Sequence, residues 1–463
     1  MLRGRDEVLG RLGRFVNAEV YFRGRKIMNL LEDDVLSVAI RHAARLFEYP
    51  DRGYFNEELR ENISKFYRVP RNTQDLLERH RLIYDTTMFS YGWFNISQAI
   101  GSDALFALLI VSKKVDEKYG TDYYSRVRKY YEYVAKNDLT IAVAQTDVKG
   151  HRKKRPHEQE DPDVYVHVVE KRNDGIVVKG AKAHTTQSVA SDELIVLPTR
   201  AMIDRDRDYA IAFAIPTDTK GVKYLVRDTG KGIIGGRAQE VETITVFDDV
   251  FVPWDRVFLF GEYDFAGELA VDFATFHRFT AISYRSATAN LYLGAASLIA
   301  KANGIETAPH VRNDLLNIIL YKEIMRMGAL AAALTPIIDQ GVAIPNPIFT
   351  NVAKLYSNDH FIDVVKSVID IAGGIIATLP SEADIENPTE RQLLVKYLRG
   401  AVSGEERLEL IRLVRELASS GLTGYMLTGM IHAEGSEEAS RIELSRQYPI
   451  KEAEDLIIKI LKS

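Results

Sequence analysis

The chain has 463 residues, enough for two or three packed domains, and its 46% hydrophobic and 27% charged residues are typical of a folded globular protein. Its formal net charge of −5, from 60 basic and 65 acidic residues, gives no support for a nucleic-acid or membrane-surface partner. The chain contains no cysteine, which excludes disulfides, thiol nucleophiles, thiolate zinc sites and ordinary iron-sulfur ligation.

The first residues are charged and lack the apolar core of a signal peptide, and no apolar run is long enough to cross a bilayer. We therefore expect a cytoplasmic protein without a membrane partner. A cysteine-free chain rich in Arg, Glu and Tyr also fits a thermophilic source. From Val35 to about Lys136, apolar residues recur at helical spacing, which predicts an N-terminal helical domain over residues 1–137.

From Asp138 to about Leu259 the pattern changes to short β-branched runs separated by turn residues. This pattern predicts a mostly antiparallel, barrel-like β domain over residues 138–262. The sequence RNDG at 172–175 predicts a hairpin turn in which Asp-Gly supplies positive φ angles. Long helical patterns then return and predict a C-terminal helical domain over residues 263–463, so the fold class is α+β.

A polar cluster follows the first predicted strand of the central region. Gln145 and Thr146 come directly after TIAVA, and Lys149 and Arg152 lie in the basic stretch beyond them. Neutral donors and acceptors at a strand end suit the edge of a planar heterocyclic cofactor, and the two cations suit its phosphates. The alternative is a solvated loop, which is the commoner role of a basic run.

Two further stretches interrupt regular patterns. His184, Thr185 and Thr186 stand together between apolar strand residues, where they either contact a ligand or cap a bend in a strand. Gly373 and Gly374 interrupt a helical pattern, where they either allow close approach to a ligand or end the helix. No GxGxxG motif follows a strand, so a Rossmann domain is not indicated.

His277 and Glu242 are the candidate catalytic residues. His277 lies in a helical stretch beside Phe273 and Phe276, a setting in which histidine is more often a packed residue than a catalyst. Glu242 precedes the predicted strand TITVFDDVFVP. A buried glutamate with a raised pKa can serve as a general acid or base, whereas glutamates at strand edges are usually on the surface.

The order of these regions and several long motifs carry a family resemblance. The motifs are TDVKGHR, GIVVKGAKAHTTQS, ETITVFDDVFVPWDRVF and DIAGGIIATLPSEAD. The chain resembles the family of 4-hydroxyphenylacetate 3-hydroxylase and 4-hydroxybutyryl-CoA dehydratase, and its motifs are closer to those of the dehydratase branch. The resemblance implies an acyl-CoA dehydrogenase-like fold, FAD bound between the β domain and the C-terminal helices, and a homotetramer.

The resemblance also implies roles for particular residues. The segment KAHTT, residues 182–186, is expected to approach the flavin ring, with Thr186 near flavin N5. The glycine pair is expected near the FAD pyrophosphate or adenine across a subunit interface. His277 matches a histidine that ligates the dehydratase cluster and handles substrate protons, and Glu242 matches an active-site glutamate. A flavin enzyme with these two residues as proton carriers is expected.

Departures from both branches are visible. Where the dehydratase has three cluster cysteines this chain has Asn95, Ala99 and Tyr284, and Ala281 and Gly429 replace a family tyrosine and glutamate. The phenol-binding motif of the hydroxylase branch is replaced by AIGSDALF, which retains only its aspartate. Tyr91, Trp93, Phe94 and Asn95 could still line a substrate pocket, or form part of the core.

Three functions remain open. The first is a flavin enzyme that acts on a CoA thioester or related acyl compound without an iron-sulfur cluster. The second is a monooxygenase that receives reduced FAD from a separate flavin reductase and hydroxylates a phenolic ring. The third is a flavin-binding paralogue that has lost its chemistry.

Overall fold

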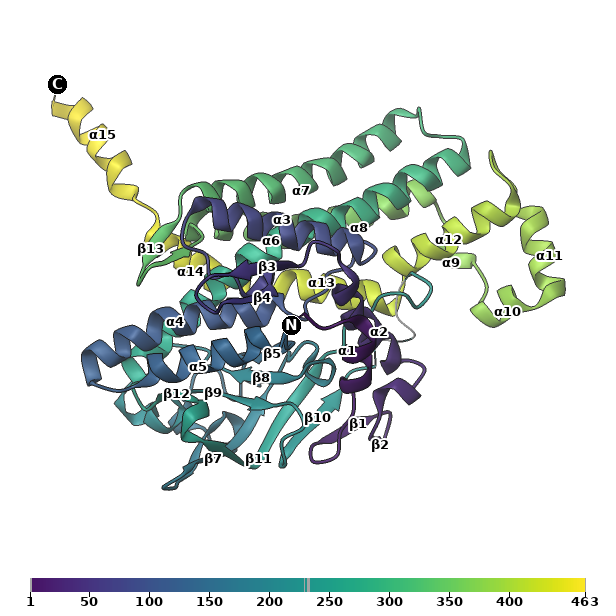
Figure 1. The fold of residues 1–463 in the computed structure, drawn as a ribbon. Coiled ribbons are helices and arrows are strands. Elements are labelled where there is room, and N and C mark those ends of the chain that lie inside the picture. Colours follow the sequence, from purple (N-terminus) through teal and green to yellow (C-terminus); the bar gives the residue numbers. More distant parts are fainter. Residues whose placement is uncertain (1, 229, 231–233, 463) are drawn as a thin grey trace.

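The structure is a computed structural model that describes residues 2–228, 230 and 234–462 (Figure 1). Up to residue 137 its helices and strands are α1 (Arg5–Arg11), β1 (Glu19–Phe22), β2 (Arg25–Ile27), α2 (Leu36–Arg45), β3 (Gly53–Asn56), β4 (Glu61–Ser64), α3 (Thr73–Phe89), α4 (Ala99–Tyr119) and α5 (Tyr123–Lys136). The side chain of Asn72 caps α3 by accepting a hydrogen bond from the Asp75 amide, and Gly120, at φ 67°, ends α4. Helix α4 is buried almost all round from Ala99 to Ser112, because this part of its sequence is mostly apolar, whereas its charged last turns are more exposed.

The next region is built from strands. They are β5 (Ile141–Ala144), β6 (His167–Lys171), β7 (Gly175–Lys182), β8 (Glu193–Val196), β9 (Ile211–Pro216), β10 (Val222–Val226), β11 (Thr243–Pro253) and β12 (Val257–Phe260). Six strands form one sheet in the order β2-β1-β10-β11-β7-β6, and four form another in the order β12-β9-β8-β5. Most neighbouring strands are antiparallel, while β1 and β10, and β5 and β8, are parallel.

The four-stranded sheet is covered on both faces. Along β5 and β8 alternate residues point to opposite sides: Ile141 and Ile195 pack in a cluster with α4 and α5, whereas Ala142 and Leu194 pack toward the six-stranded sheet. Because both faces of these strands are buried, their sequences are continuously apolar and do not alternate between apolar and polar residues.

Two details of the β region differ from the expectation. The hairpin between β6 and β7 is present, but neither Asp174 nor Gly175 has a positive φ, so the turn is not of the primed type. The Arg172 amide donates to the Gly175 carbonyl at 2.8 Å, and the register shifts between Val168 and Glu170. The register shift is a β-bulge in β6, a few residues before the turn.

The N-terminal region also contains strands that the helical prediction missed. Strand β1 joins the six-stranded sheet beside β10, and Val20 pairs with Tyr224. Such a short strand has little local signal, because its partner lies far along the chain.

The rest of the chain is mainly helical. Its elements are α6 (Tyr263–Asn303), α7 (Pro309–Leu334), β13 (Ile337–Asp339), β14 (Val342–Ile344), α8 (Pro347–Ala372), α9 (Ile375–Thr378), α10 (Glu382–Glu386), α11 (Pro388–Tyr397), α12 (Gly404–Ala418), α13 (Gly421–His432), α14 (Glu437–Gln447) and α15 (Ile450–Lys462). Helices α6, α7 and α8 pack on one another, and α3 packs against α6 and α7. Helix α15 extends away from the body of the molecule (Figure 1). Within the described ranges no helix is long and apolar enough to span a bilayer.

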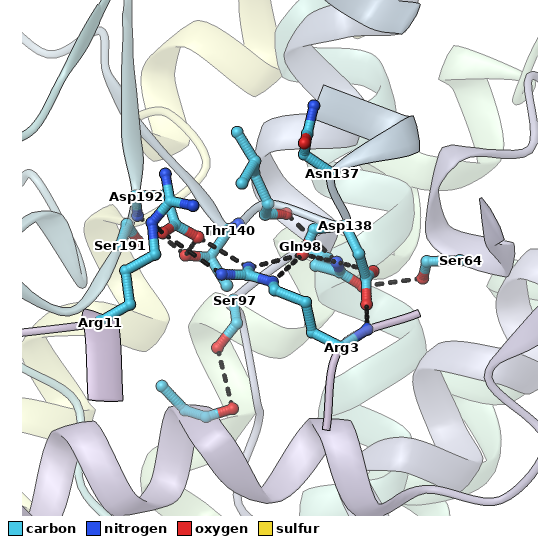
Figure 2. A network of polar contacts seen from close by, with 12 residues as sticks. Arg3, Arg11, Ser64, Ser97, Gln98, Asn137, Asp138, Thr140, Ser191 and Asp192 are labelled. Carbon is cyan, nitrogen blue, oxygen red and sulfur yellow. Dashed lines mark hydrogen bonds and ion pairs between the residues drawn. The ribbon is translucent and has the colours of Figure 1, made fainter. Parts of the chain in front are cut away.

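A buried polar network joins the first residues to the β region (Figure 2). Arg3 donates to the Asp138 carbonyl at 2.9 Å and to the Asp192 carboxylate at 2.7 Å, and Arg52 donates to the Asp138 carboxylate at 2.6 Å. We call Arg3, Arg52, Asp138 and Asp192 the Arg3 clamp. It holds the start of α1 against the connections that lead into β5 and β8.

Candidate active site

A cavity of about 310 Å³ is lined by segments from all three regions of the chain. The N-terminal region supplies Trp93, Phe94, Ile96 and Ile100, the β region supplies Val143, Gln145, Thr146, His184, Thr186, Arg227, Glu240 and Glu242, and α6 supplies Phe273, His277, Tyr284 and Thr288. Helix α13 and the residues after it complete the wall, from Tyr425 to Gly435. Predicted residues that are distant in sequence therefore share one cavity.

Gln145 and Thr146 lie at the end of β5, where Lys182 fixes their backbone. The buried Lys182 ammonium donates to the Gln145 carbonyl at 2.8 Å and pairs with the Asp147 carboxylate at 2.6 Å. The Ala183 amide donates to the Thr146 carbonyl at 2.8 Å. The lysine in KAHTT thus has a positioning role: it ties the end of β5 to β7 and holds two polar side chains at the cavity.

The threonines that follow it divide between the interior and the cavity. Thr185 is buried, does not line the cavity, and donates its amide to the Thr243 carbonyl at 3.1 Å. Thr186 does line the cavity, and its hydroxyl donates to Glu242 Oε1 at 2.6 Å. His184 reaches the cavity from a left-handed backbone position at φ 54°. The bend therefore presents His184 and Thr186 and packs Thr185.

Glu242 belongs to a group of acidic and phenolic side chains on the cavity wall. Tyr425 Oη lies 2.9 Å from Glu242 Oε1 and 3.1 Å from Glu240 Oε2. Burial raises the pKa of Glu242 to about 6, although Thr186 and Tyr425 oppose the shift by donating hydrogen bonds to it. Burial and the neighbouring Glu242 raise the pKa of Glu240 to about 8. Carboxyl groups with pKa values in this range can act as general acids or bases near neutral pH.

His277 reaches the cavity from α6 and has a carboxylate behind it. Its Nδ1 lies 3.5 Å from Asp103 Oδ2, and its ring stacks on Phe273 with the centroids 5.3 Å apart. Asp103 is fully buried and is held by Arg79 at 2.6 Å and by the Thr280 hydroxyl at 3.0 Å. The 3.5 Å separation is too long for a hydrogen bond, and His277 Nδ1 and Asp103 Oδ2 both lack a hydrogen-bond partner among the described residues. The aspartate in AIGSDALF thus lies behind His277 without a hydrogen bond to it.

Tyr284 lies in a part of the cavity wall that is made of aromatic and charged side chains. The Tyr284 ring stacks on Phe94 at 4.2 Å, and its hydroxyl donates to Glu434 at 2.9 Å. Arg285, fully buried, donates to the same carboxylate at 2.6 Å. Burial alone would raise the pKa of Glu434, but Arg285 and other nearby cations outweigh it and lower that pKa.

Several predicted cofactor residues lie outside this cavity. Lys149 and Arg152 are exposed in the loop after β5. Gly373 and Gly374 end α8 and precede α9, and both are exposed in the single chain. A role for the two glycines therefore stays a prediction about an interface between subunits.

Sequence reasoning missed Glu240, Tyr425, Arg227 and Glu434 as members of the cavity wall. The pair Glu240 and Glu242 carries a local signal, because residues two apart in an extended segment point the same way. Tyr425 and Glu434 have no such signal, since only the packing of the C-terminal helices brings them to the cavity. Of the proposed aromatic wall, Trp93 and Phe94 line the cavity, whereas Tyr91 and Asn95 do not.

Comparison with known proteins agrees with this architecture. The chain is 32% identical to 4-hydroxybutyryl-CoA dehydratase/vinylacetyl-CoA-Delta-isomerase of Clostridium aminobutyricum, over 96% of each chain. Its structure superposes on an oxygen-tolerant archaeal 4-hydroxybutyryl-CoA dehydratase from N. maritimus with a TM-score of 0.94 and 28% identity, covering 100% of this chain and 95% of the other.

The second branch shares the fold. The oxygenase component of 4-hydroxyphenylacetate 3-monooxygenase, solved in complex with FAD, superposes with a TM-score of 0.90 at 24% identity, covering 99% of this chain and 98% of the other. The expected α+β, acyl-CoA dehydrogenase-like fold is thus confirmed. Residues 6–259 match the N-terminal part of 4-hydroxyphenylacetate 3-hydroxylase and residues 266–462 its C-terminal part. The chain therefore belongs to the 4-hydroxyphenylacetate 3-hydroxylase family, which its sequence motifs had indicated.

Proposed function

We propose that this chain is an FAD-dependent enzyme that acts on a CoA thioester or related acyl compound without an iron-sulfur cluster. The observation that carries the proposal is the meeting of Gln145, Thr146 and Thr186 with Glu242 and His277 in one cavity. FAD, when bound, supplies the capacity to accept and donate electrons. The residues of this chain orient it and move protons.

The residues present fit a flavin and do not fit a cluster. Neutral donors and acceptors line the end of β5 and the bend after β7, and the buried Glu242 Oε2 has no hydrogen-bond partner within the described chain. Such groups suit the polar edge of a flavin. At the positions that match the cluster cysteines, Asn95 donates to the His42 carbonyl at 2.6 Å and Tyr284 donates to Glu434, so neither offers a thiolate.

Glu242 and His277 are the groups that exchange protons with the substrate. Glu242 is held by hydrogen bonds from Thr186 and Tyr425, and the His277 ring is packed on Phe273, so both groups face the cavity. One acts as base while the other acts as acid, which is the requirement for moving a hydrogen on an acyl chain.

A reduced-FAD-dependent aromatic monooxygenase, supplied by a separate flavin reductase, is the second candidate. The aromatic wall of Trp93, Phe94 and Tyr284 favours it, because stacked rings suit a phenolic substrate. We place either enzyme in the cytoplasm as a homotetramer. Helix α12 packs Leu408, Ile411 and Val414 into the core. Helix α15, by contrast, exposes a row of apolar side chains that suits contact with another subunit.

Anaerobic titration separates these functions. Apo-protein is titrated with oxidised FAD, reduced FAD and a panel of acyl-CoA thioesters, and absorbance and calorimetry are recorded. Tight binding of oxidised FAD with a spectrum perturbed by a CoA thioester supports the acyl-CoA enzyme. Preference for reduced FAD without a CoA response supports the monooxygenase, and flavin binding without turnover or ligand response supports a non-catalytic paralogue. Absence of flavin binding contradicts all three.

A further inference from the structure

Glu240 and Glu242 are two partly buried carboxyl groups that contact the same phenol. They flank Val241 just before β11, so both side chains point into the same cavity. Tyr425 comes from α13 and places its hydroxyl between them, 3.1 Å from Glu240 and 2.9 Å from Glu242. The proposed function uses Glu242, which Tyr425 holds in place, and assigns no role to Glu240.

The hydrogens of this group can be counted. A phenol has one hydrogen to donate, and a carboxylate has none. If both carboxyls were ionised, Tyr425 could donate its hydrogen to only one of them. The other carboxylate would then lie about 3 Å from the phenol oxygen with no hydrogen between the two oxygens, which is unfavourable in a partly buried site. A proton on one carboxyl resolves the conflict, because that group then donates to the phenol oxygen while the phenol donates to the other.

The surroundings decide which carboxyl holds this proton. Glu242 Oε1 also accepts from Thr186 at 2.6 Å, so it receives two donors and suits the ionised form. Arg227, whose guanidinium stacks 4.5 Å from the Tyr425 ring centroid, also favours an ionised Glu242. Glu240 faces Glu242 and, farther away, Glu434, both of which disfavour its negative charge. The other titratable side chains on the cavity wall are His184, His277, Tyr284 and His432.

We infer that Glu240, Tyr425 and Glu242 share one proton. The proton is on Glu240 while Glu242 acts as a base, and it is transferred through Tyr425 to Glu242 when Glu242 acts as an acid. In the transfer the Glu240 Oε2–H bond breaks as a hydrogen joins Tyr425 Oη, and the original phenol hydrogen moves to Glu242 Oε1. The net charge of the trio does not change. Glu240 and Tyr425 are positioning residues, because they act on the substrate only through Glu242.

This inference rests on the proposed function only for the step at the substrate. The pKa directions support the resting arrangement: the pKa of Glu240, near 8, is higher than that of Glu242, near 6. The proton therefore stays in the trio at neutral pH, while Glu242 is available as a base. Such a reversible store lets an enzyme remove a proton at one carbon and return one at another.

The shared proton is tested by infrared spectroscopy of the full-length protein, which needs no substrate. A protonated carboxyl has its own carbonyl stretching band, and we expect a component of this band at neutral pH in the wild type that disappears in Glu240→Gln, while Asp272, whose pKa burial raises to about 7, contributes equally to both proteins. In Tyr425→Phe the band should shift, because its hydrogen-bond acceptor is removed. The matched control is Glu262→Gln, since Glu262 is also partly buried beside a tyrosine hydroxyl, that of Tyr123 at 3.3 Å, but lies outside the cavity. Wild type without the band, or a band of the same intensity in Glu240→Gln as in the wild type, overturns the inference whatever the substrate is.

The use of the proton is tested by a pH profile of turnover once a substrate is known. Wild type should lose activity on the alkaline side as Glu240 ionises. Glu240→Gln should be slower by at least about tenfold and should lack that alkaline limb, whereas Glu262→Gln should keep it. A Glu240→Gln enzyme with an unchanged rate and profile overturns the role of Glu240 in the transfer. If no acyl-CoA is turned over, the proposed function is wrong. The infrared experiment still decides independently whether the three residues share a proton.

Discussion

Thr186 connects the expected flavin edge to the acid-base group, because its hydroxyl donates to Glu242 at 2.6 Å. We predict that Thr186→Val changes the affinity, spectrum or reduction potential of bound flavin, since a hydroxyl beside the ring is replaced by a methyl group. The pKa of Glu242 should also rise, because one of the hydrogen bonds that hold it down is removed. Flavin titration and potentiometry measure the first effect. Thr186→Ser, which keeps the hydroxyl, is the control, and flavin properties identical in all three proteins would rule out the contact.

His277 is predicted to be essential for turnover and dispensable for folding. His277→Ala should lower turnover by about a hundredfold or more, the usual scale for loss of a general acid or base, while flavin binding and melting temperature change little. Asp103→Asn should lower turnover less, because Asp103 lies 3.5 Å behind the ring without a hydrogen bond to it, and should instead lower the melting temperature, because the buried ion pair with Arg79 is weakened. Steady-state kinetics and thermal melts make the comparison. The exposed His360 on α8 supplies the control variant His360→Ala, and an active His277→Ala enzyme would remove His277 from the mechanism.

Glu240 should make stability depend on pH. Its pKa is raised from the ordinary 4.5 to about 8 by burial and by Glu242, so the folded protein binds more protons than the unfolded chain between these values. The contribution of Glu240 to stability is therefore greatest at acid pH and is lost as the pH rises through this window. Glu240→Gln should be more stable than wild type at pH 9 by on the order of 2 kcal/mol, and nearly equal to it at pH 4. Urea unfolding at both pH values, with the exposed Glu390→Gln as control, tests the sign, and a difference independent of pH would contradict it.

At the scale of elements, the Arg3 clamp should stabilise the attachment of α1 to the β region. Arg3→Met leaves the carboxylate of Asp192 buried with one partner fewer, which typically costs about 3–5 kcal/mol. Arg11 offers a matched control, because it contacts the same carboxylate at 2.8 Å but its side chain is 53% exposed. Arg11→Met should cost less than about 1 kcal/mol. Chemical unfolding of both variants tests the contrast, and equal losses would show that burial does not set the strength of these pairs.

The elements also show what sequence patterns reveal. Strands β5 and β8 were visible as apolar runs because both of their faces are buried, and α4 was visible because its apolar content is so high. Strand β1 was not, because a four-residue strand is specified by its partner β10 rather than by its own residues. The residues of the cavity wall differ in the same way in how far the sequence predicts them. Thr186, Glu242 and His277 lie in recognisable sequence motifs, whereas Tyr425 and Glu434 are brought to the cavity only by the packing of α13 and the segment after it.

At the scale of the whole molecule, α15 predicts how chains assemble. None of its residues is buried, and Leu456, Ile457 and Leu461 are 58%, 54% and 80% exposed on a helix that extends from the body (Figure 1). An amphipathic helix with its apolar face in water is unfavourable at roughly 25 cal/mol per Å² of apolar surface, so contact with another subunit should stabilise it. We predict a homotetramer in light scattering, and a shift to smaller species when Leu456 and Leu461 are both replaced by Glu. Glu454→Lys changes charge on the same helix without touching the apolar row and should leave the assembly intact. A wild-type monomer, or a double variant with unchanged mass, would show that α15 does not hold the subunits together.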